Sequence, residues 1–352
     1  MVFYNREDDI RRMKAVLSGE PNLLYFVYGP INSGKTALLM KVLEELLENY
    51  KVFYINFRWR DVERIEDFLQ VLFKVRRGDN RENVKEFTKD LIREGFKALG
   101  KLKGIPIPER IFDYLFLDSK KADDIFEYME DMFEEIVEEG LRPVLVFDEL
   151  QSIKDILNGT GKPVLGRLFN FLVGMTKEKH LCHSLCSTSD CLFIEDIYSN
   201  ARLEGRAKYL LVDDLGKEEA FRTYEAFGFE DSELVWEYIG GKIGDMVSLF
   251  EEKKGGYKEQ EALDRMLRDE AGRIEWMLDL VEEGEKVGPG IEEIKDILRK
   301  FKDKEKWAYR EVKGKALKFL IQENILFYNP VEGTIRPQGR LLWRTIREVI
   351  EA

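Results

Sequence analysis

The sequence contains few of the residues that form disulfides or bind metals. Only three cysteines and two histidines occur among its 352 residues, and all five lie between His180 and Cys191. Three thiols cannot build a disulfide framework, and their spacing matches no common zinc-binding pattern. Residues 180–187 are predicted to form a strand, in which neighbouring side chains point to opposite faces. We therefore expect neither disulfides nor a metal site in this segment.

Long hydrophobic runs and an excess of basic charge are also absent. The apolar runs, such as 23–28 and 144–147, are far shorter than the roughly 20 residues that a membrane-spanning helix needs. The first residues, MVFYNREDD, lack the basic and apolar segments of a signal peptide. The formal net charge of −12 opposes binding to nucleic acid, unless basic residues gather on one face. These absences predict a cytoplasmic protein without a membrane partner.

The first 214 residues instead contain an alternation of apolar strand patterns and helical patterns. Strands that alternate with helices predict an α/β fold with a doubly wound parallel sheet and helices on both of its faces. Residues from about 60 to 120 are expected to form a helical insertion. The sheet should have five strands, at residues 23–28, 52–57, 143–147, 180–187 and 209–212.

Beyond residue 214 the pattern changes to helices and a single hairpin. Residues 215–284 predict helices only, and the segment GEKVGPG at 284–290 is the clearest linker. Two helices, a two-stranded hairpin at 325–336 and a final helix follow, which is the order of a winged-helix domain. We therefore expect three domains: an α/β domain at 1–214, a helical lid at 215–284 and a winged helix at 285–352.

The segment GPINSGKT, at 29–36, lies between the first predicted strand and a helical pattern. It fits G-x-x-x-x-G-K-[ST], the Walker A phosphate-binding loop. Its glycines allow a concave loop whose N–H groups point inward, and the following helix adds its positive dipole end. Lys35 is expected to reach the β- and γ-phosphates. The predicted nucleotide-binding residues are Gly29, Pro30, Ile31, Asn32, Ser33, Gly34, Lys35, Thr36 and Ala37.

The segment PVLVFDELQ, at 143–151, supplies the acidic residues that such a loop needs. Asp148 and the Thr36 hydroxyl are predicted to hold Mg²⁺. Glu149 is predicted to be the catalytic base that deprotonates an attacking water, and Gln151 either positions water or forms a cap. Because the N-K-x-D motif of guanine sites is absent, we expect the nucleotide to be ATP.

These motifs and their order resemble the archaeal ATPases of the STAND branch of P-loop NTPases, which are related to AAA+ proteins. The resemblance covers roughly the whole chain. Besides the loop and the acidic segment, it rests on FYNREDDI at 3–10, SLCSTSD at 184–190, LEGRAKYLLVDDL at 203–215, IGGKIGDMVSLF at 239–250 and the winged-helix pattern. The family's lid often reads Gly-Gly-x-Pro, whereas this chain has GGKIG, so the lid's contact with the nucleotide stays open.

The resemblance also implies roles for residues outside the two motifs. Asn5 and Arg6 would approach the nucleotide base. Ser187, Thr188 or Ser189 would lie beside the γ-phosphate, and Arg206 would sense the phosphate and contribute to catalysis. The residues themselves equally permit a solvent-exposed Arg206 and an Arg6 that pairs with the neighbouring Glu7.

The leading hypothesis is a Mg²⁺-dependent ATPase of the STAND type, whose lid and winged helix switch an interaction with a protein partner. The first alternative is an ATP-regulated DNA-binding protein similar to origin-recognition proteins, and the second is a small-molecule kinase that uses residues 60–120 as an acceptor lid. The sequence leaves open the partner, the oligomeric state and whether another subunit donates an arginine. Residues proposed for DNA contact are Lys313, Lys315, Lys318, Arg336 and Arg340.

Overall fold

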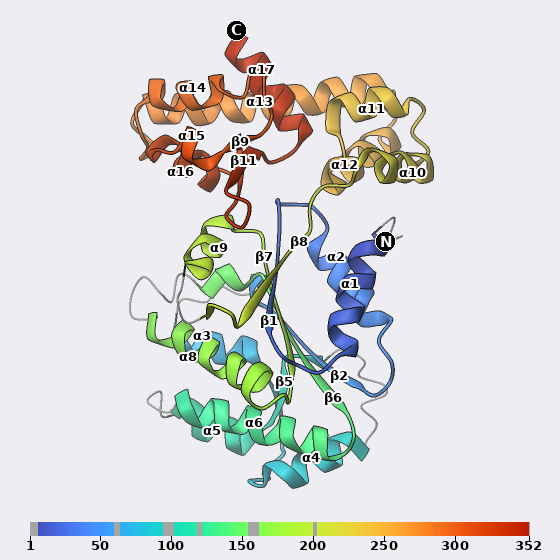
Figure 1. The fold of residues 1–352 in the computed structure, drawn as a ribbon, viewed down its shortest axis with the longest axis vertical. Coiled ribbons are helices and arrows are strands. Elements are labelled where there is room, and N and C mark those ends of the chain that lie inside the picture. Colours follow the sequence, from blue (N-terminus) through green and yellow to red (C-terminus); the bar gives the residue numbers. More distant parts are fainter. Residues whose placement is uncertain are drawn as a thin grey trace.

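The computed structural model describes residues 6–59, 64–93, 102–117, 122–153, 162–199 and 203–351. The molecule has two tiers, which Figure 1 shows one above the other. A parallel sheet with its covering helices forms the lower tier. The residues after 214 form the upper tier, which sits over one end of the sheet.

Five parallel strands form the main sheet, as the sequence predicts. Their order is β2-β6-β7-β1-β8, and the two-residue strand β4 (Leu102–Lys103) extends the edge beside β2. Since β7 lies between β1 and β6, the loops that follow β1 and β6 flank the end of β7. The five strands are β1 (Leu24–Tyr28), β2 (Tyr50–Asn56), β6 (Arg142–Asp148), β7 (His183–Thr188) and β8 (Ala207–Leu211).

Alternate residues of the strands face two different helical layers. Val27 packs with α1 (Glu7–Ser18) and α2 (Lys35–Glu44) on one face of the sheet. Its neighbour Phe26 points to the opposite face, where its ring lies 5.8 Å from that of Phe169 in α8 (Lys162–Val173). Helices α6 (Ala122–Glu138) and α9 (Cys191–Tyr198) also contribute to this second layer.

The predicted helical insertion at residues 60–120 contains helices, but it also contains strands. Helices α3 (Ile65–Leu72), α4 (Val84–Arg93) and α5 (Glu109–Leu117) are present. Two short strands, β3 (Phe73–Arg76) and β5 (Ile105–Pro108), form a separate parallel pair. Strand β5 contains two prolines, and a strand with a free edge tolerates their missing N–H groups.

The fourth predicted strand begins later than expected. Strand β7 starts at His183, whereas His180 has a φ of 53° and precedes the strand. The side chains of Cys182 and Cys186 are buried and form no disulfide. Burial lowers the pKa of His183 to about 4, so its imidazole is neutral. Within the described ranges, no three Cys, His, Asp or Glu side chains lie close enough to hold a metal.

The upper tier begins with four helices and continues with a small sheet. The helical unit consists of α10 (Lys217–Phe227), α11 (Ser232–Ile239), α12 (Ile243–Lys254) and the first half of α13 (Glu259–Glu282). We call residues 291–351 the C-terminal unit. Its elements are α14 (Ile291–Arg299), β9 (Trp307–Ala308), α15 (Tyr309–Val312), α16 (Lys315–Gln322), β10 (Leu326–Asn329), β11 (Thr334–Pro337) and α17 (Arg340–Glu351).

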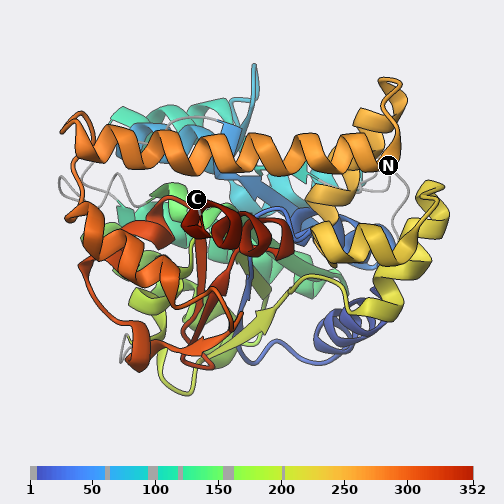
Figure 2. The ribbon, with the colours of Figure 1, turned by 90° about the horizontal axis from the view of Figure 1, so that it is seen from above.

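The predicted hairpin of the C-terminal unit is present, and a third strand joins it. Strands β10 and β11 are antiparallel, and β9 pairs with the outer side of β11. Seen from above in Figure 2, α13 crosses the molecule and connects the two parts of the upper tier. Among the described helices, none combines the length and the apolar character that a bilayer span requires.

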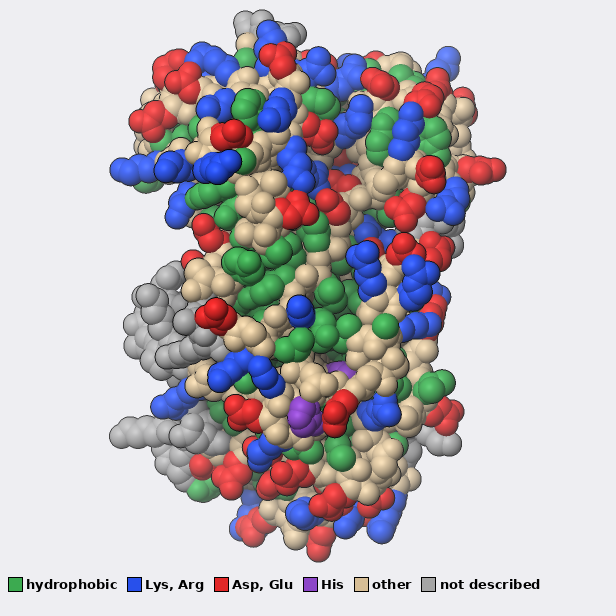
Figure 3. Space-filling model, in the orientation of Figure 1, with side chains coloured by type: hydrophobic (Ala, Val, Ile, Leu, Met, Phe, Trp, Pro, Cys, Tyr) green, Lys and Arg blue, Asp and Glu red, His purple; other side chains and the backbone are tan. Residues whose placement is uncertain are grey.

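Acidic and basic side chains alternate over the upper tier on the face that Figure 3 shows. Hydrophobic side chains are more frequent between the two tiers on this face. Lys313, Lys315 and Lys318, which the sequence places on a DNA-contacting helix, are exposed in and before α16. Because these three side chains are exposed, a ligand can reach them. The side chain of Arg336, by contrast, is mostly buried and ion-paired.

Candidate functional site

The segment 29–36 forms the tight connection between β1 and α2 that its sequence predicts. Gly29 is required because a Cβ atom there would lie 2.1 Å from the carbonyl oxygen of Val212. Gly34 directly precedes α2 and has a φ of 90°, a backbone conformation that residues other than glycine rarely adopt. The loop therefore places the N-terminus of α2, with its free N–H groups, at the end of the sheet.

Lys35 is buried beside the loop, with 6% of its surface exposed. Its Nζ donates hydrogen bonds to the carbonyl oxygens of Gly29 at 3.1 Å and Pro30 at 2.7 Å. An ammonium group has three N–H donors, so one remains for a ligand in the loop. Burial lowers the pKa of Lys35 to about 8, although the nearby Glu149 carboxylate opposes this shift.

Asp148 ends β6 and meets Thr36 directly. The Thr36 hydroxyl donates a hydrogen bond of 2.9 Å to Oδ2 of Asp148, whose side chain is fully buried. Two residues of β2 contact the same oxygen: the Tyr54 hydroxyl at 2.5 Å and the Asn56 amide at 3.4 Å. The structure thus brings together the two predicted Mg²⁺ ligands and adds two partners that sequence reasoning missed. The sequence does contain an indication of these partners, because Tyr54 and Asn56 are polar residues at alternate positions of the second predicted strand.

Glu149 adopts an unfavourable backbone conformation next to the loop. Its φ is 58°, and a non-glycine residue persists in this region only where its surroundings hold it. Its carboxylate is buried and accepts hydrogen bonds from Gln151 and, at 3.4 Å, from the Ser189 hydroxyl. Arg58 forms an ion pair with Oε1 at 2.8 Å. Backbone strain of this kind concentrates at functional sites, which supports a role for Glu149 beyond packing.

The end of β7 contributes polar groups to the same cluster. The Thr188 hydroxyl donates to Oε1 of Gln151 at 2.6 Å, so Gln151 links Thr188 to Glu149. Ser187 lies inside the strand opposite Val27, and the alternation of side chains points it away from Thr188. Of the three candidates for the position beside the γ-phosphate, the structure therefore brings Thr188 and Ser189, rather than Ser187, to Glu149 and Gln151.

Arg6 reaches the loop through its guanidinium group. It donates hydrogen bonds to the carbonyl oxygens of Ser33 at 2.6 Å and Asp213 at 2.7 Å, and its carboxylate partner is Asp9 rather than Glu7. Arg6 is 6% exposed and ties the start of α1 to the loop and to the segment after β8. Asn5, its predicted companion at the nucleotide base, lies outside the described residues.

Arg206 lies at the wrong end of the sheet for the predicted phosphate contact. Its carbonyl oxygen accepts a hydrogen bond from the N–H of Leu24, the first residue of β1, and its side chain is exposed. The loop follows the last residue of β1, Tyr28, roughly 13 Å further along the strand at about 3.3 Å per residue. The structure therefore does not bring Arg206 to the loop.

Both parts of the upper tier contact the backbone of the loop. Lys242, at the start of α12, donates to the carbonyl oxygen of Ile31 at 2.8 Å. Gln338, which precedes α17, accepts from the N–H of Ile31 at 3.2 Å. The N–H of Gly244 donates to the carbonyl oxygen of Asn32 at 3.1 Å. Lys242 and Gln338 are 4% and 1% exposed, and only the Gly-Gly-Lys segment around Lys242 drew attention in the sequence.

A second set of contacts joins the hairpin of the C-terminal unit to the lower tier. Arg336 forms ion pairs with Asp213 and, at 3.4 Å, with Asp214. The Tyr28 hydroxyl donates to Oδ1 of Asn329 at 2.8 Å. The prediction that Arg336 faces DNA is therefore wrong, because its guanidinium group is directed into this contact between the tiers.

The chemistry of the loop suits an anionic phosphate chain and a hard cation. The Ser33 hydroxyl is buried in the loop and has no hydrogen-bond partner within the described residues. Buried polar groups without partners are uncommon, and a ligand oxygen would satisfy this one. The ammonium group of Lys35 adds a positive charge, and Thr36 and Asp148 offer the oxygen ligands that Mg²⁺ prefers.

The chain matches known protein families over most of its length. Residues 3–249 match a family described as an ATPase domain predominantly from Archaea, and residues 260–350 match the C-terminal domain family of MJ1010-like uncharacterized ATP-binding proteins. Two Methanocaldococcus jannaschii proteins, named uncharacterized ATP-binding proteins MJ0147 and MJ0801, are each 39% identical to this chain. Those alignments cover 99% of this chain in both cases, and 98% and 100% of the two relatives.

Among solved structures, the Walker-type ATPase PABY2304 of Pyrococcus abyssi has a similar fold. Its TM-score is 0.63 at 18% identity, over 98% of this chain and 96% of that one. The family match spans more than half of the chain, and the two Methanocaldococcus relatives align over nearly its whole length. The chain is therefore a member of the archaeal ATPase-domain family.

Proposed function

We propose that the chain binds MgATP at residues 29–37 and hydrolyses it, and that it works as a molecular switch of the STAND type. The observation that carries this proposal is the meeting of Thr36 with Asp148 beside the buried Lys35. Membership of an ATPase-domain family and the names of the ATP-binding relatives support the choice of nucleotide.

In this proposal each part of the site has one task. Lys35 and the N–H groups of the loop bind the β- and γ-phosphates. Thr36 and Asp148 hold Mg²⁺, which neutralises charge on the phosphate oxygens when it is bound. Glu149 accepts a proton from the attacking water, and Gln151 and Ser189 hold its carboxylate in position. Arg58 must leave Glu149 for this step, because its ion pair occupies Oε1.

The proposed switch has three parts: the ATPase domain at 1–214, the lid at 215–284 and a winged helix at 285–352. Lys242 of the lid and Gln338 of the winged helix both bond to Ile31. A ligand that changes the backbone of the loop would change these contacts, and with them the positions of both parts. The switch would alter a surface that binds a protein partner, such as a second subunit.

The two alternatives have less support. Of the five residues proposed for DNA contact, Arg336 is ion-paired to Asp213 and Asp214. Helices α4 and α5 of the 60–120 insertion lie at the end of the sheet opposite the upper tier (Figure 1). Because Lys242 and Gln338 place the loop beside the upper tier, these helices are poorly placed to cover an acceptor substrate.

Two variants test the proposed activity. Lys35→Ala should abolish tight MgATP binding in calorimetry, because it removes the cation at the phosphates. Glu149→Gln should bind MgATP with an affinity close to that of the unmodified protein but release no phosphate, because an amide cannot accept the proton. Equal phosphate release by Glu149→Gln and the unmodified protein would contradict the assigned base, and unchanged binding by Lys35→Ala would contradict the site itself.

A further inference from the structure

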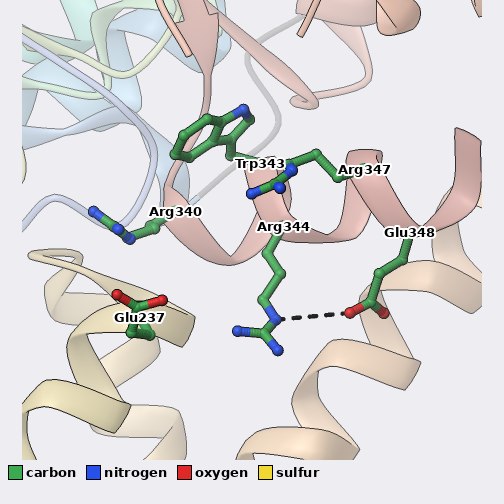
Figure 4. A pocket seen from close by; sticks show the side chains of 6 residues that line it. All are labelled: Glu237, Arg340, Trp343, Arg344, Arg347 and Glu348. Atoms are coloured by element: carbon green, nitrogen blue, oxygen red, sulfur yellow. Dashed lines mark ion pairs between the residues drawn. The ribbon is translucent and has the colours of Figure 1, made fainter. Parts of the chain in front are cut away.

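A pocket lies in the upper tier, between α11 and α17, and shares no residue with the loop. Its volume is about 320 Å³, and we call it the arginine pocket. In Figure 4 the guanidinium groups of Arg340 and Arg344 extend from α17 towards the side where Glu237 of α11 lies. The lining residues are Glu237, Arg340, Trp343, Arg344, Arg347 and Glu348.

The positive charges of this pocket are unfavourable without a bound anion. Arg340, Arg344 and Arg347 follow one another at helical spacings of four and three residues, so they share one face of α17 and repel each other. Arg340 is also the first residue of α17, and the first turn contains no acidic residue that would complement the helix dipole. Such a cluster is unexpected in a chain whose net charge is −12.

Aromatic rings lie close to the guanidinium groups. The guanidinium carbon of Arg344 lies 3.8 Å from the ring centre of Tyr238, and that of Arg340 lies 5.3 Å from Trp236. Arg347 lies 5.6 Å from Trp343, whose own Nε1 donates to the carbonyl oxygen of Phe301 at 2.7 Å. At 3.8 Å the face of the Arg344 guanidinium group contacts the Tyr238 ring, which leaves the N–H donors at the edges of that group available to a ligand.

The carboxylates around the pocket do not neutralise it. Three arginines and two glutamates give the lining a net charge of +1. Arg344 pairs with Glu348 at 3.6 Å, which is a long distance for an ion pair. Among the described side chains, which end at Ile350 in α17, no carboxylate forms an ion pair with Arg340 or Arg347. The pocket therefore presents N–H donors whose charge is only partly compensated.

We propose that the arginine pocket binds a phosphoryl group. A planar guanidinium fork donates two parallel hydrogen bonds to two oxygens of a phosphate, and several forks around one pocket surround the group from different sides. The same chemistry is offered by the backbone of a nucleic acid and by a free polyphosphate. The proposal does not depend on what the loop binds, because the two sites have no residue in common.

Binding of two probes tests the proposal in the full chain. All proteins carry Lys35→Ala, so that the loop does not compete for phosphate. The probes are pyrophosphate, followed by calorimetry, and a labelled 20-nucleotide single strand, followed by fluorescence anisotropy at several salt concentrations. The test variant is Arg344→Gln/Arg347→Gln. The matched control is Lys85→Gln/Arg93→Gln, which removes two exposed positive charges from α4, at the end of the molecule opposite the upper tier.

The test variant should bind at least tenfold more weakly than its parent, whereas the control should bind like the parent. If the test variant loses affinity for pyrophosphate, the ligand is a free phosphate chain. If it loses affinity only for the single strand, the ligand is a nucleic-acid backbone, and binding then also weakens as salt is added. An equal loss in both variants, or a parent that binds neither probe, would overturn the proposal. Matching thermal unfolding curves of the two variants exclude a loss of fold as the cause.

Discussion

The side chain of Gln338 accepts a hydrogen bond from the backbone N–H of Ile31, although the two residues are 307 positions apart in the chain. Ile31 lies in the loop between β1 and α2, and Gln338 connects β11 to α17 in the C-terminal unit. The same residue also donates to the carbonyl oxygen of Leu326 at 3.3 Å, which fixes the orientation of its amide. This contact makes the conformation of the loop and the position of the C-terminal unit depend on each other.

We predict that Gln338→Ala loosens the loop. The substitution leaves the N–H of Ile31 without its acceptor, at a cost of about 1–3 kcal/mol to the docking of the two tiers. Hydrogen exchange followed by mass spectrometry should show faster exchange in peptides that contain residues 29–34. Gln322→Ala, which changes an exposed glutamine of α16, is the control. Equal exchange rates in the two variants would show that the Gln338 contact does not restrain the loop.

We predict that Arg58→Ala increases ATP turnover. Arg58 occupies an oxygen of Glu149, yet its own side chain is 69% exposed, so the ion pair is weak and contributes about 1 kcal/mol or less. Its removal should raise the steady-state rate of phosphate release by at most about fivefold. Arg64→Ala removes an arginine of similar exposure, 73%, that pairs with Asp67 instead, and should leave the rate unchanged. A lower rate for Arg58→Ala would mean that Arg58 assists the reaction.

Tyr54→Phe is expected to destabilise the protein more than Tyr50→Phe. The Tyr54 hydroxyl donates to the buried carboxylate of Asp148 at 2.5 Å. Hydrogen bonds to charged groups contribute about 1.5–3 kcal/mol, and those to neutral groups about 1 kcal/mol. Tyr50 belongs to the same strand and donates to the carbonyl oxygen of Leu17 at 2.9 Å. Urea unfolding of both variants measures the difference, and a larger loss in Tyr50→Phe would contradict the importance of the Asp148 contact.

The affinity for MgATP should fall as the pH rises from 7 to 9. The pKa of Lys35 is about 8 in the ligand-free protein because of burial, and the charged form is the one that attracts phosphate. Above this pKa a proton must be taken up during binding, so affinity at pH 9 should be about tenfold below its value at low pH. Calorimetry in two buffers of different ionisation enthalpy measures both affinity and proton uptake. An affinity that stays constant over this range would show that Lys35 remains charged throughout.

Local patterns in the sequence were sufficient to predict the sheet and the loop. The five strands are short apolar segments, and GPINSGKT carries its information in eight consecutive residues. Asp148 was found for the same reason, since it follows an apolar run directly. A contiguous pattern of this kind reflects the local backbone, which is largely decided by neighbouring residues.

The contacts around the loop were not predictable in this way. Gln338 and Lys242 bond to Ile31 from positions more than 200 residues away. Nothing in the neighbourhood of Gln338 indicates the loop, and the GGKIG segment around Lys242 left its contact with the nucleotide open. Arg206 was assigned to the phosphates from the family resemblance of the segment LEGRAKYLLVDDL, but the register of β8 beside β1 places it at the other end of the sheet. Strand pairing of this kind is decided by the whole fold, so a single sequence does not reveal it.

Helix α13 has a mechanical consequence for the upper tier. Its first half, including Leu263, packs in the core of the helical unit, and its second half, including Ile274, packs in the core that contains the C-terminal unit. An uninterrupted helix of 24 residues is about 36 Å long and behaves as a rigid rod. It therefore acts as a lever: a tilt of about 10° at one end moves the other by roughly 6 Å. A small displacement near Lys242 would therefore become a larger displacement at α14.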